Sequence, residues 1–189
     1  MKNPHIAVFV AAVAVISMAS VQAQTQSNAS PKMYAEIGYA ALNLKETFGA
    51  STAKASPGVL TGVFGYQFLP NLAVEGLVGL GGGKAGVKEN GVPNGVNVKI
   101  TSAFGVFIKP SVAVSDSIDL FARAGWLHTT LKISEGPFSE SDSDNSFAYG
   151  LGANFNLSKT SYIQANWMNY YKKDGLKVDG FGVSYGMRF

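Results

Sequence analysis

The sequence predicts an all-β protein, an eight-stranded antiparallel up-and-down transmembrane β-barrel. Large apolar residues recur at every second position in several segments of strand length, only 14% of the 189 residues are charged, and residues 24–189 contain no apolar run of helix-spanning length. The alternation is clearest near the end of the sequence. There Phe181, Val183 and Tyr185 share one face with Met187 and Phe189, because successive side chains of a strand point to opposite sides.

The first 23 residues have the organisation of a secretory signal peptide. Lys2 precedes an apolar stretch at residues 6–16, and Val21-Gln22-Ala23 forms a small-residue cleavage site. A retained membrane helix is disfavoured because the apolar stretch is too short. We expect residues 1–23 to be removed, residues 24–32 to form a periplasmic tail and residues 33–189 to form the barrel. The sequence contains no cysteine, so neither a disulfide framework nor a lipid-bearing thiol is expected.

Eight segments are long enough to cross a bilayer as tilted strands, which takes about 9 to 11 residues. They are residues 33–45, 58–69, 72–82, 98–114, 118–133, 146–157, 161–172 and 176–189. Short turns alternate with longer connections at residues 46–57, 83–97 and 137–145, and the last connection, at residues 173–175, is tight. Short periplasmic turns and longer extracellular loops are typical of barrels in the outer membrane.

The alternation also separates a lipid face from a lumen face. In residues 146–157, aromatic and aliphatic side chains share one face while glycine, serine and asparagine dominate the other. Because a lysine or arginine at mid-bilayer costs about 2 to 4 kcal/mol, the uncharged apolar face must be the lipid side. Elsewhere the same alternation predicts that the following side chains face outward: Ala35, Ile37, Tyr39, Phe64, Tyr66, Phe68, Val74, Val78, Leu80, Leu120, Ala122, Ala124, Trp126, Ile163, Ala165 and Trp167.

Four charged side chains, Glu36, Glu75, Arg123 and Arg188, are then predicted to point into the lumen, each in the periplasmic half of its strand. We expect Glu36 to meet Arg188 across the closing seam and Glu75 to meet Arg123 across the lumen. A polar gate or ion path is one interpretation. We favour a structural plug, because eight strands enclose a lumen just wide enough for side chains to fill and buried charges persist by pairing.

Four segments, Met33-Tyr34-Ala35-Glu36-Ile37-Gly38-Tyr39, residues 65–75, Leu120-Phe121-Ala122-Arg123-Ala124-Gly125 and residues 185–189, resemble the small OmpA-like and opacity-protein-like outer-membrane barrels. The resemblance implies residence in the outer membrane among lipid and lipopolysaccharide. It implies that Tyr185 and Phe189 belong to the signal read by the barrel assembly machinery, and that Glu75 and Arg123 belong to an interior ionic network. Gln164 is a departure, because relatives can carry an acidic residue there.

No enzymatic activity, cofactor or metal is expected. Barrel enzymes that modify lipid need a nucleophile with a base and an orienting group, and His128 is the only histidine after residue 23. It is predicted to face outward near the extracellular rim beside Trp126. The glycine-rich residues 79–83 lack the lysine and serine or threonine of a phosphate loop. Lysine and arginine are scattered, so nucleic acid is not an expected partner.

The connections are the expected places of specific recognition. Residues 134–144 carry four acidic residues and no basic one, which fits either a solvated acidic loop or calcium binding. Six lysines lie near the predicted outer rim, and they are candidate contacts for lipopolysaccharide phosphates or ordinary solvated side chains. They are Lys54, Lys84, Lys88, Lys172, Lys173 and Lys177.

Two functions from different classes remain at this stage. The first is a structural or surface-interaction scaffold that displays its loops to extracellular ligands above a plugged lumen. The second is a transport barrel for small solutes or apolar molecules. Small inward residues such as Gly38, Gly150, Gly152 and Gly186 favour space in the lumen, whereas the four charges favour closure. We expect the first function.

Overall fold

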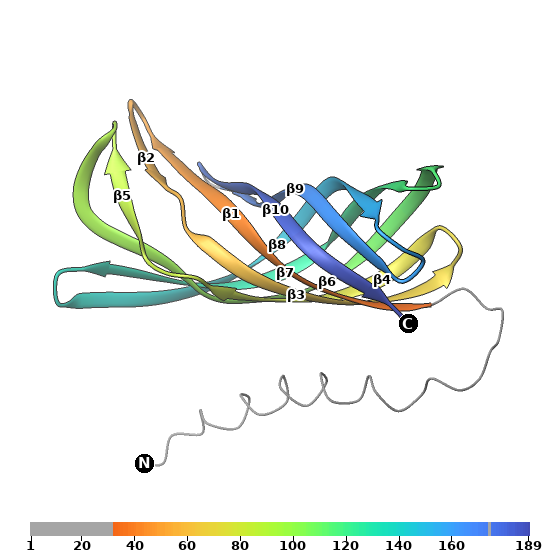
Figure 1. Ribbon diagram of the computed structural model, residues 1–189. Coiled ribbons are helices and arrows are strands. Elements are labelled where there is room, and N and C mark those ends of the chain that lie inside the picture. Colours follow the sequence, from red (N-terminus) through yellow and green to blue (C-terminus); the bar gives the residue numbers. More distant parts are fainter. Residues whose placement is uncertain (1–31, 174) are drawn as a thin grey trace, which may run out of the picture. The chain divides into compact units, whose positions relative to one another are not determined.

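The computed structural model describes residues 32–173 and 175–189, which form one antiparallel sheet (Figure 1). The predicted signal peptide and most of the predicted tail lie outside these residues. The strands are β1 (Met33–Phe48), β2 (Ser51–Ala55), β3 (Gly58–Leu69), β4 (Leu72–Gly81), β5 (Ala85–Glu89), β6 (Val92–Ser115), β7 (Ile118–Glu135), β8 (Phe138–Asn156), β9 (Ser161–Lys173) and β10 (Leu176–Arg188).

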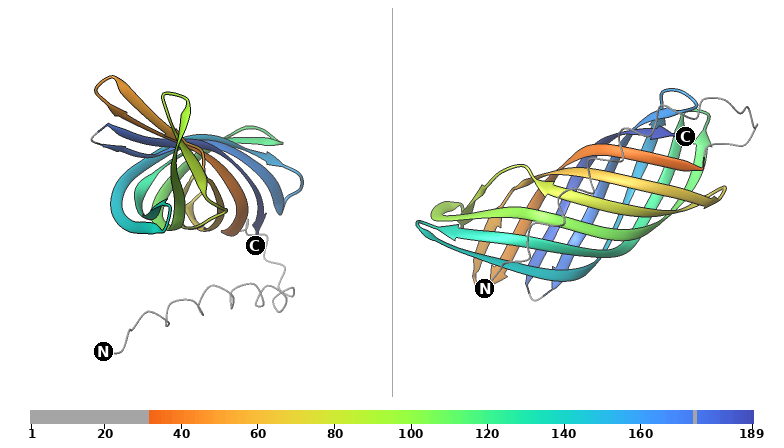
Figure 2. Two further views of the ribbon diagram at one scale, coloured as in Figure 1. Left: turned by 90° about the vertical axis from the view of Figure 1, so that its left-hand side faces the viewer. Right: turned by 90° about the horizontal axis from the view of Figure 1, so that it is seen from below.

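Within the described residues, eight of these strands close into a ring in the order β1, β3, β4, β6, β7, β8, β9 and β10. The ring closes where β1 pairs with β10, and there Met33 N–H donates to Phe189 O at 3.1 Å while Phe189 N–H donates to Met33 O at 2.9 Å. The two views in Figure 2 show the strands wrapping obliquely around the barrel. The predicted eight-stranded antiparallel barrel is confirmed.

The prediction of long loops at residues 46–57, 83–97 and 137–145 is wrong, because most of these residues continue as paired hairpins. β2 pairs with β1 from Leu44 opposite Ala55 onward, so it extends the line of β3, and β5 pairs with β2 and β6. Asn90 and Gly91 have φ of 47° and 89°, which suits a two-residue hairpin turn. We name this end of the barrel the long-hairpin end and the opposite end the short-turn end.

No helix within residues 32–173 and 175–189 has the length and apolar character needed to cross a bilayer.

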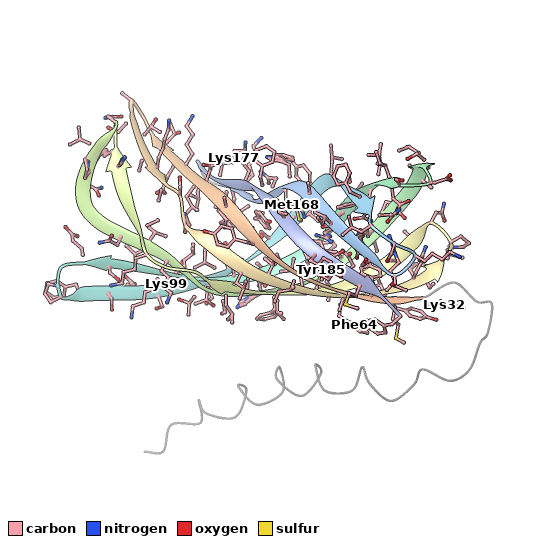
Figure 3. All side chains as sticks on the ribbon, viewed as in Figure 1. Lys32, Phe64, Lys99, Met168, Lys177 and Tyr185 are labelled. Carbon is pink, nitrogen blue, oxygen red and sulfur yellow. The ribbon has the colours of Figure 1, made fainter. Side chains whose placement is uncertain are left out.

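The predicted division between outward and inward faces is confirmed. Ile37, Trp126 and Phe181 are 61%, 68% and 67% exposed on the outer surface, whereas inward Met168 is 1% exposed. Figure 3 labels two further outward aromatic residues, Phe64 and Tyr185, together with Met168. The outer surface is therefore apolar around the part of the ring where these residues lie, and the lumen holds the buried side chains.

The ring is not paired to the same height everywhere. β7 and β8 pair up to Glu135 opposite Phe138, but the pairing of β8 with β9 stops at Tyr149 opposite Asn169. The part of β8 before Tyr149 therefore rises beyond its ladder with β9 at the long-hairpin end.

Candidate functional site

The short-turn half of the lumen holds a cluster of two acidic and two basic side chains, which we name the ionic cluster. Glu36, Glu75, Lys109 and Arg123 come from β1, β4, β6 and β7, and they are 5%, 1%, 4% and 3% exposed. Each occupies an inward position because its chain neighbours occupy the outer face. The four formal charges cancel.

Arg123 and Lys109 each contact both carboxylates. Arg123 Nε donates to Glu75 Oε2 at 2.5 Å and Arg123 Nη2 donates to Glu75 Oε1 at 3.0 Å, while Nη2 lies 3.4 Å from Glu36 Oε2. Lys109 Nζ lies 3.1 Å from Glu36 Oε1 and 3.2 Å from Glu75 Oε1. This bidentate contact of Arg123 with Glu75 fixes the relative orientation of the two side chains and also compensates their charges.

Neutral donors add further hydrogen bonds to the same carboxylates. The hydroxyl groups of Tyr34 and Tyr162 donate to Glu75 Oε1 and Glu36 Oε1, each at 2.7 Å. Gln164 Nε2 donates to Glu36 Oε1, also at 2.7 Å. Gln164, the departure from the OmpA-like pattern, thus serves as a donor to an acidic residue. Because each carboxylate receives several donors, these hydrogen bonds compensate for its burial.

The predicted contact between Glu36 and Arg188 is wrong. Arg188 lies opposite Tyr34, and its Nη2 donates to Asp119 Oδ2 at 3.2 Å and to Asn156 Oδ1 at 2.8 Å. Its guanidinium stacks on the Tyr162 ring at 4.4 Å. Tyr162 therefore links this second, partly exposed ion pair to the ionic cluster.

Sequence reasoning missed Lys109 and Asp119. Lys109 follows outward Ile108 and shares the inward face with Phe107, which is 1% exposed, so the same alternation places it in the lumen. Asp119 precedes outward Leu120 in the same way. Both residues were therefore detectable from the pattern that identified the other charges.

Many inward glycines are covered by large side chains, contrary to their interpretation as space. A Cβ at Gly186 would overlap the Tyr162 ring, and a Cβ at Gly152 would overlap the Phe121 ring. Near the short-turn end the small residues accommodate aromatic rings, so these glycines contribute to close packing.

The long-hairpin half of the lumen is apolar. Leu42, Val59, Ile100 and Val178 belong to one buried cluster and are 6%, 5%, 3% and 6% exposed. A second apolar cluster, which includes Phe107, separates this half from the ionic cluster. The lumen therefore changes from ionic to apolar along its axis.

Five lysines lie opposite one another across five strands on the outer surface of the long-hairpin end, and we name them the lysine row. In strand order they are Lys172, Lys177, Lys45, Lys54 and Lys88. Opposed residues on neighbouring strands place their Cβ atoms about 5 Å apart. Lys177 also contacts Asp179 at 3.2 Å. The row contains four of the six lysines identified from the sequence, together with Lys45. Lys45 was missed because the sequence does not reveal which residues of neighbouring strands lie opposite it.

The remaining predicted lysines lie elsewhere. Lys173 is opposite Leu176 and therefore on the other face from Lys172, where its charge acts on Asp144. Lys84 precedes β5 and is exposed. In a separate pair, Lys99 on β6 lies opposite Lys132 on β7.

The other predicted sites have simple surroundings. His128 Nδ1 lies 2.9 Å from Asn145 Oδ1, and its ring lies 4.7 Å from that of Phe104. The acidic residues 134–144 form the outer end of the β7–β8 hairpin rather than a loop. Among the described residues no group of three or more acidic, histidine or cysteine side chains is arranged to hold a metal. Tyr185 and Phe189 face outward, and the Phe189 ring lies 6.2 Å from that of Phe64.

Comparisons with known proteins agree with this architecture. The family model of the outer membrane protein beta-barrel domain matches residues 11–189. The attachment invasion locus protein of Yersinia enterocolitica is 33% identical over 86 residues, which are 46% of this chain and 48% of that protein. The alignment thus spans about half the length of that relative.

Solved structures extend the similarity to most of the chain. The crystal structure of the attachment invasion locus protein Ail of Yersinia pestis matches with a TM-score of 0.62 and 26% identity, over 85% of this chain and 100% of that one. Neisserial surface protein A matches with a TM-score of 0.65 and 10% identity, over 83% and 97% of the two chains. At that identity the second likeness concerns the fold alone.

Proposed function

Because this chain belongs to the outer membrane protein beta-barrel domain family and is an outer-membrane protein, we propose that it acts as a surface-interaction scaffold. In this proposal the long hairpins lie outside the cell, the ionic cluster plugs the lumen, and the lysine row binds polyanions bearing closely spaced phosphate or sulfate groups. The phosphates of lipopolysaccharide are the first such source, because the outer leaflet surrounds the barrel.

The lysine row is the observation that carries this proposal. Like charges directly opposite one another destabilise a sheet, and here Lys54 lies between Lys45 on β1 and Lys88 on β5. An anionic ligand offsets this repulsion. Lys45 is six residues beyond outward Tyr39, about 20 Å along the strand, which puts the row past the apolar band.

The ionic cluster supports the plug. Its members are at most 5% exposed and come from four strands around the ring, so they span the lumen and leave each carboxylate paired with a cation. Transport through the lumen would require these contacts to open. The proposed role involves no reaction. Among the described residues, His128 contacts Asn145 through a hydrogen bond and Phe104 through its ring.

A related protein provides a soluble probe. The Yersinia pestis Ail protein has also been crystallised in complex with the heparin analogue sucrose octasulfate. That complex is a property of Ail, and for this chain it identifies a compact polysulfate with which the lysine row can be tested.

The test compares two triple variants with the same change in charge. Lys45→Gln, Lys54→Gln and Lys88→Gln neutralise part of the row, whereas Lys32→Gln, Lys84→Gln and Lys159→Gln neutralise exposed lysines outside it. We expect the row variant to bind sucrose octasulfate about tenfold more weakly in nanodiscs, because each exposed ion pair contributes up to about 1 kcal/mol. The control variant should bind within about twofold of wild type.

A second arm distinguishes the lipid source. Thermal unfolding is measured in membranes containing lipopolysaccharide and in membranes containing its dephosphorylated form. We expect phosphorylated lipopolysaccharide to raise the unfolding temperature of wild type and of the control variant more than that of the row variant. Equal behaviour of the two triple variants in both arms would overturn the assignment of the row.

A further inference from the structure

The apolar half of the lumen contains a cavity of about 120 Å³. All eight strands of the ring contribute to its wall, among them Ala40 on β1, Leu77 on β4, Leu127 on β7 and Tyr170 on β9. An aliphatic cavity of about 150 Å³ in another protein stays dry and binds benzene. The cavity described here is therefore of a size and lining that suit one small apolar group.

The cavity is closed toward the short-turn end. Leu77 and Leu127 line it and also belong to the packed apolar cluster that contains Phe107, Ala148 and Met168, which are 1%, 0% and 1% exposed. Directly below, Met168 Sδ lies 3.9 Å from Arg123 Nη1 of the ionic cluster. A molecule in the cavity would thus rest on a packed floor, and it would have to enter and leave from the long-hairpin end.

The lip of the cavity carries negative charge. Asp142 and Asp144 of β8 line it from inward positions opposite Leu131 and Thr129, and both carboxylates remain exposed. Asp144 Oδ2 accepts a hydrogen bond from the Tyr171 hydroxyl at 2.8 Å. β8 rises beyond its ladder with β9 at this point, so the lip lies beside an unpaired stretch of the ring.

We propose that this cavity is a blind binding site for a small amphipathic cation, with an aromatic or short aliphatic body in the cavity and an ammonium group between Asp142 and Asp144. Burial of the apolar body supplies the attraction. The two carboxylates select the sign of the head group. The neighbouring Lys173 opposes the ammonium, so it tunes the affinity downward. The site goes beyond polyanion binding, because it uses the opposite charge and the inner surface.

Three probes with one phenyl body separate the contributions of body and head group. They are 2-phenylethylammonium, 2-phenylethanol and phenylacetate, titrated against the protein in nanodiscs with methyl-labelled leucine, isoleucine and valine. We expect the cation to shift the methyl signals of Leu77 and Leu127. Lipid-facing Leu120 and Leu151 report the partition of each probe into the bilayer, and their shifts are the baseline for those of Leu77 and Leu127.

Variants test the two parts of the site separately. Asp142→Asn with Asp144→Asn should weaken binding of the cation about fivefold, as expected for exposed ion pairs, and leave the alcohol unchanged. Ala40→Leu, which places extra carbons in the cavity, should abolish binding of both. A lumen that shows no cation-dependent shift at Leu77 and Leu127, or that binds phenylacetate as tightly as the cation, overturns the proposal.

Lys173→Gln provides a control of opposite sign. Removing this positive charge should tighten binding of 2-phenylethylammonium while leaving 2-phenylethanol unchanged. Weaker binding of the cation to this variant would contradict the assigned position of the head group.

Discussion

The two halves of the lumen are enclosed by the same strands but filled by opposite chemistry. Near the short turns, Glu36, Glu75, Lys109 and Arg123 form a compact set of buried ion pairs. Near the long hairpins, aliphatic side chains surround a cavity of about 120 Å³. Alternation alone determines that a side chain points inward. Whether the lumen is then solid or hollow depends on the residues placed at those positions.

The ionic half and the apolar half also stabilise the barrel through different interactions. Buried ion pairs replace lost hydration with mutual attraction, and breaking one leaves a charge without compensation. Aliphatic side chains around a cavity gain from burial but lack some of the contacts of a filled core. We therefore expect the ionic half to be more sensitive to truncation and the apolar half to tolerate added volume.

The largest effect is expected from Arg123→Met. This change removes one of the two cations that contact both carboxylates, so Glu75 keeps Lys109 as its charged partner among the described residues. We expect the free energy of unfolding to fall by about 3 to 5 kcal/mol, measured by denaturant titration in lipid vesicles with tryptophan fluorescence. Arg123→Lys is the matched control. It should lose less free energy of unfolding, because it keeps the charge although it loses the bidentate contact. A loss below about 1 kcal/mol for Arg123→Met would show that the ion pairs are dispensable.

A matched pair of insertions compares the packed floor with the cavity. Ala148 is 0% exposed in the floor, whereas Ala40, 3% exposed, lines the cavity. We expect Ala148→Leu to destabilise the barrel by about 1 to 3 kcal/mol through overpacking, and Ala40→Leu to stabilise it by about 0.5 to 2 kcal/mol through cavity filling. The same denaturant titration measures both, and equal losses would contradict a hollow upper half.

The smallest effect concerns an exposed carboxylate at the lip of the cavity. The hydrogen bond from Tyr171 lowers the pKa of Asp144, with help from the backbone N–H of Asn145. Because the folded-state pKa lies below the unfolded one, this contact stabilises the hairpin above the ordinary aspartate pKa and is lost as pH falls through the lowered value. Titration of the Asp144 carboxyl by carbon NMR should therefore show a higher midpoint in Tyr171→Phe than in wild type. An unchanged midpoint would mean that the hydrogen bond does not hold the charge.

The contrast between the two halves was only partly predictable from sequence. Alternation identified the outward faces and the inward positions of Glu36, Glu75 and Arg123 without any knowledge of contacts. It did not reveal that Arg188 pairs with Asp119, because that contact depends on stagger between β7 and β10 rather than on parity. The hairpin extensions were mistaken for loops because their polar sequences lack a lipid-facing apolar row. The lysine row could not be predicted either, because its five lysines come from five different strands and the register between these strands is not readable from the sequence.

Planar-bilayer conductance of the refolded protein without residues 1–23 tests the central claim, that the ionic half closes the lumen beneath a blind cavity. Wild type should show no steady conductance, and Ala40→Gly, which enlarges the cavity without touching the ionic cluster, should also remain closed. Glu75→Ala and Arg123→Ala serve as variants that weaken the cluster, and channel openings are expected only in them. Steady ion conductance through the wild-type barrel would contradict the account.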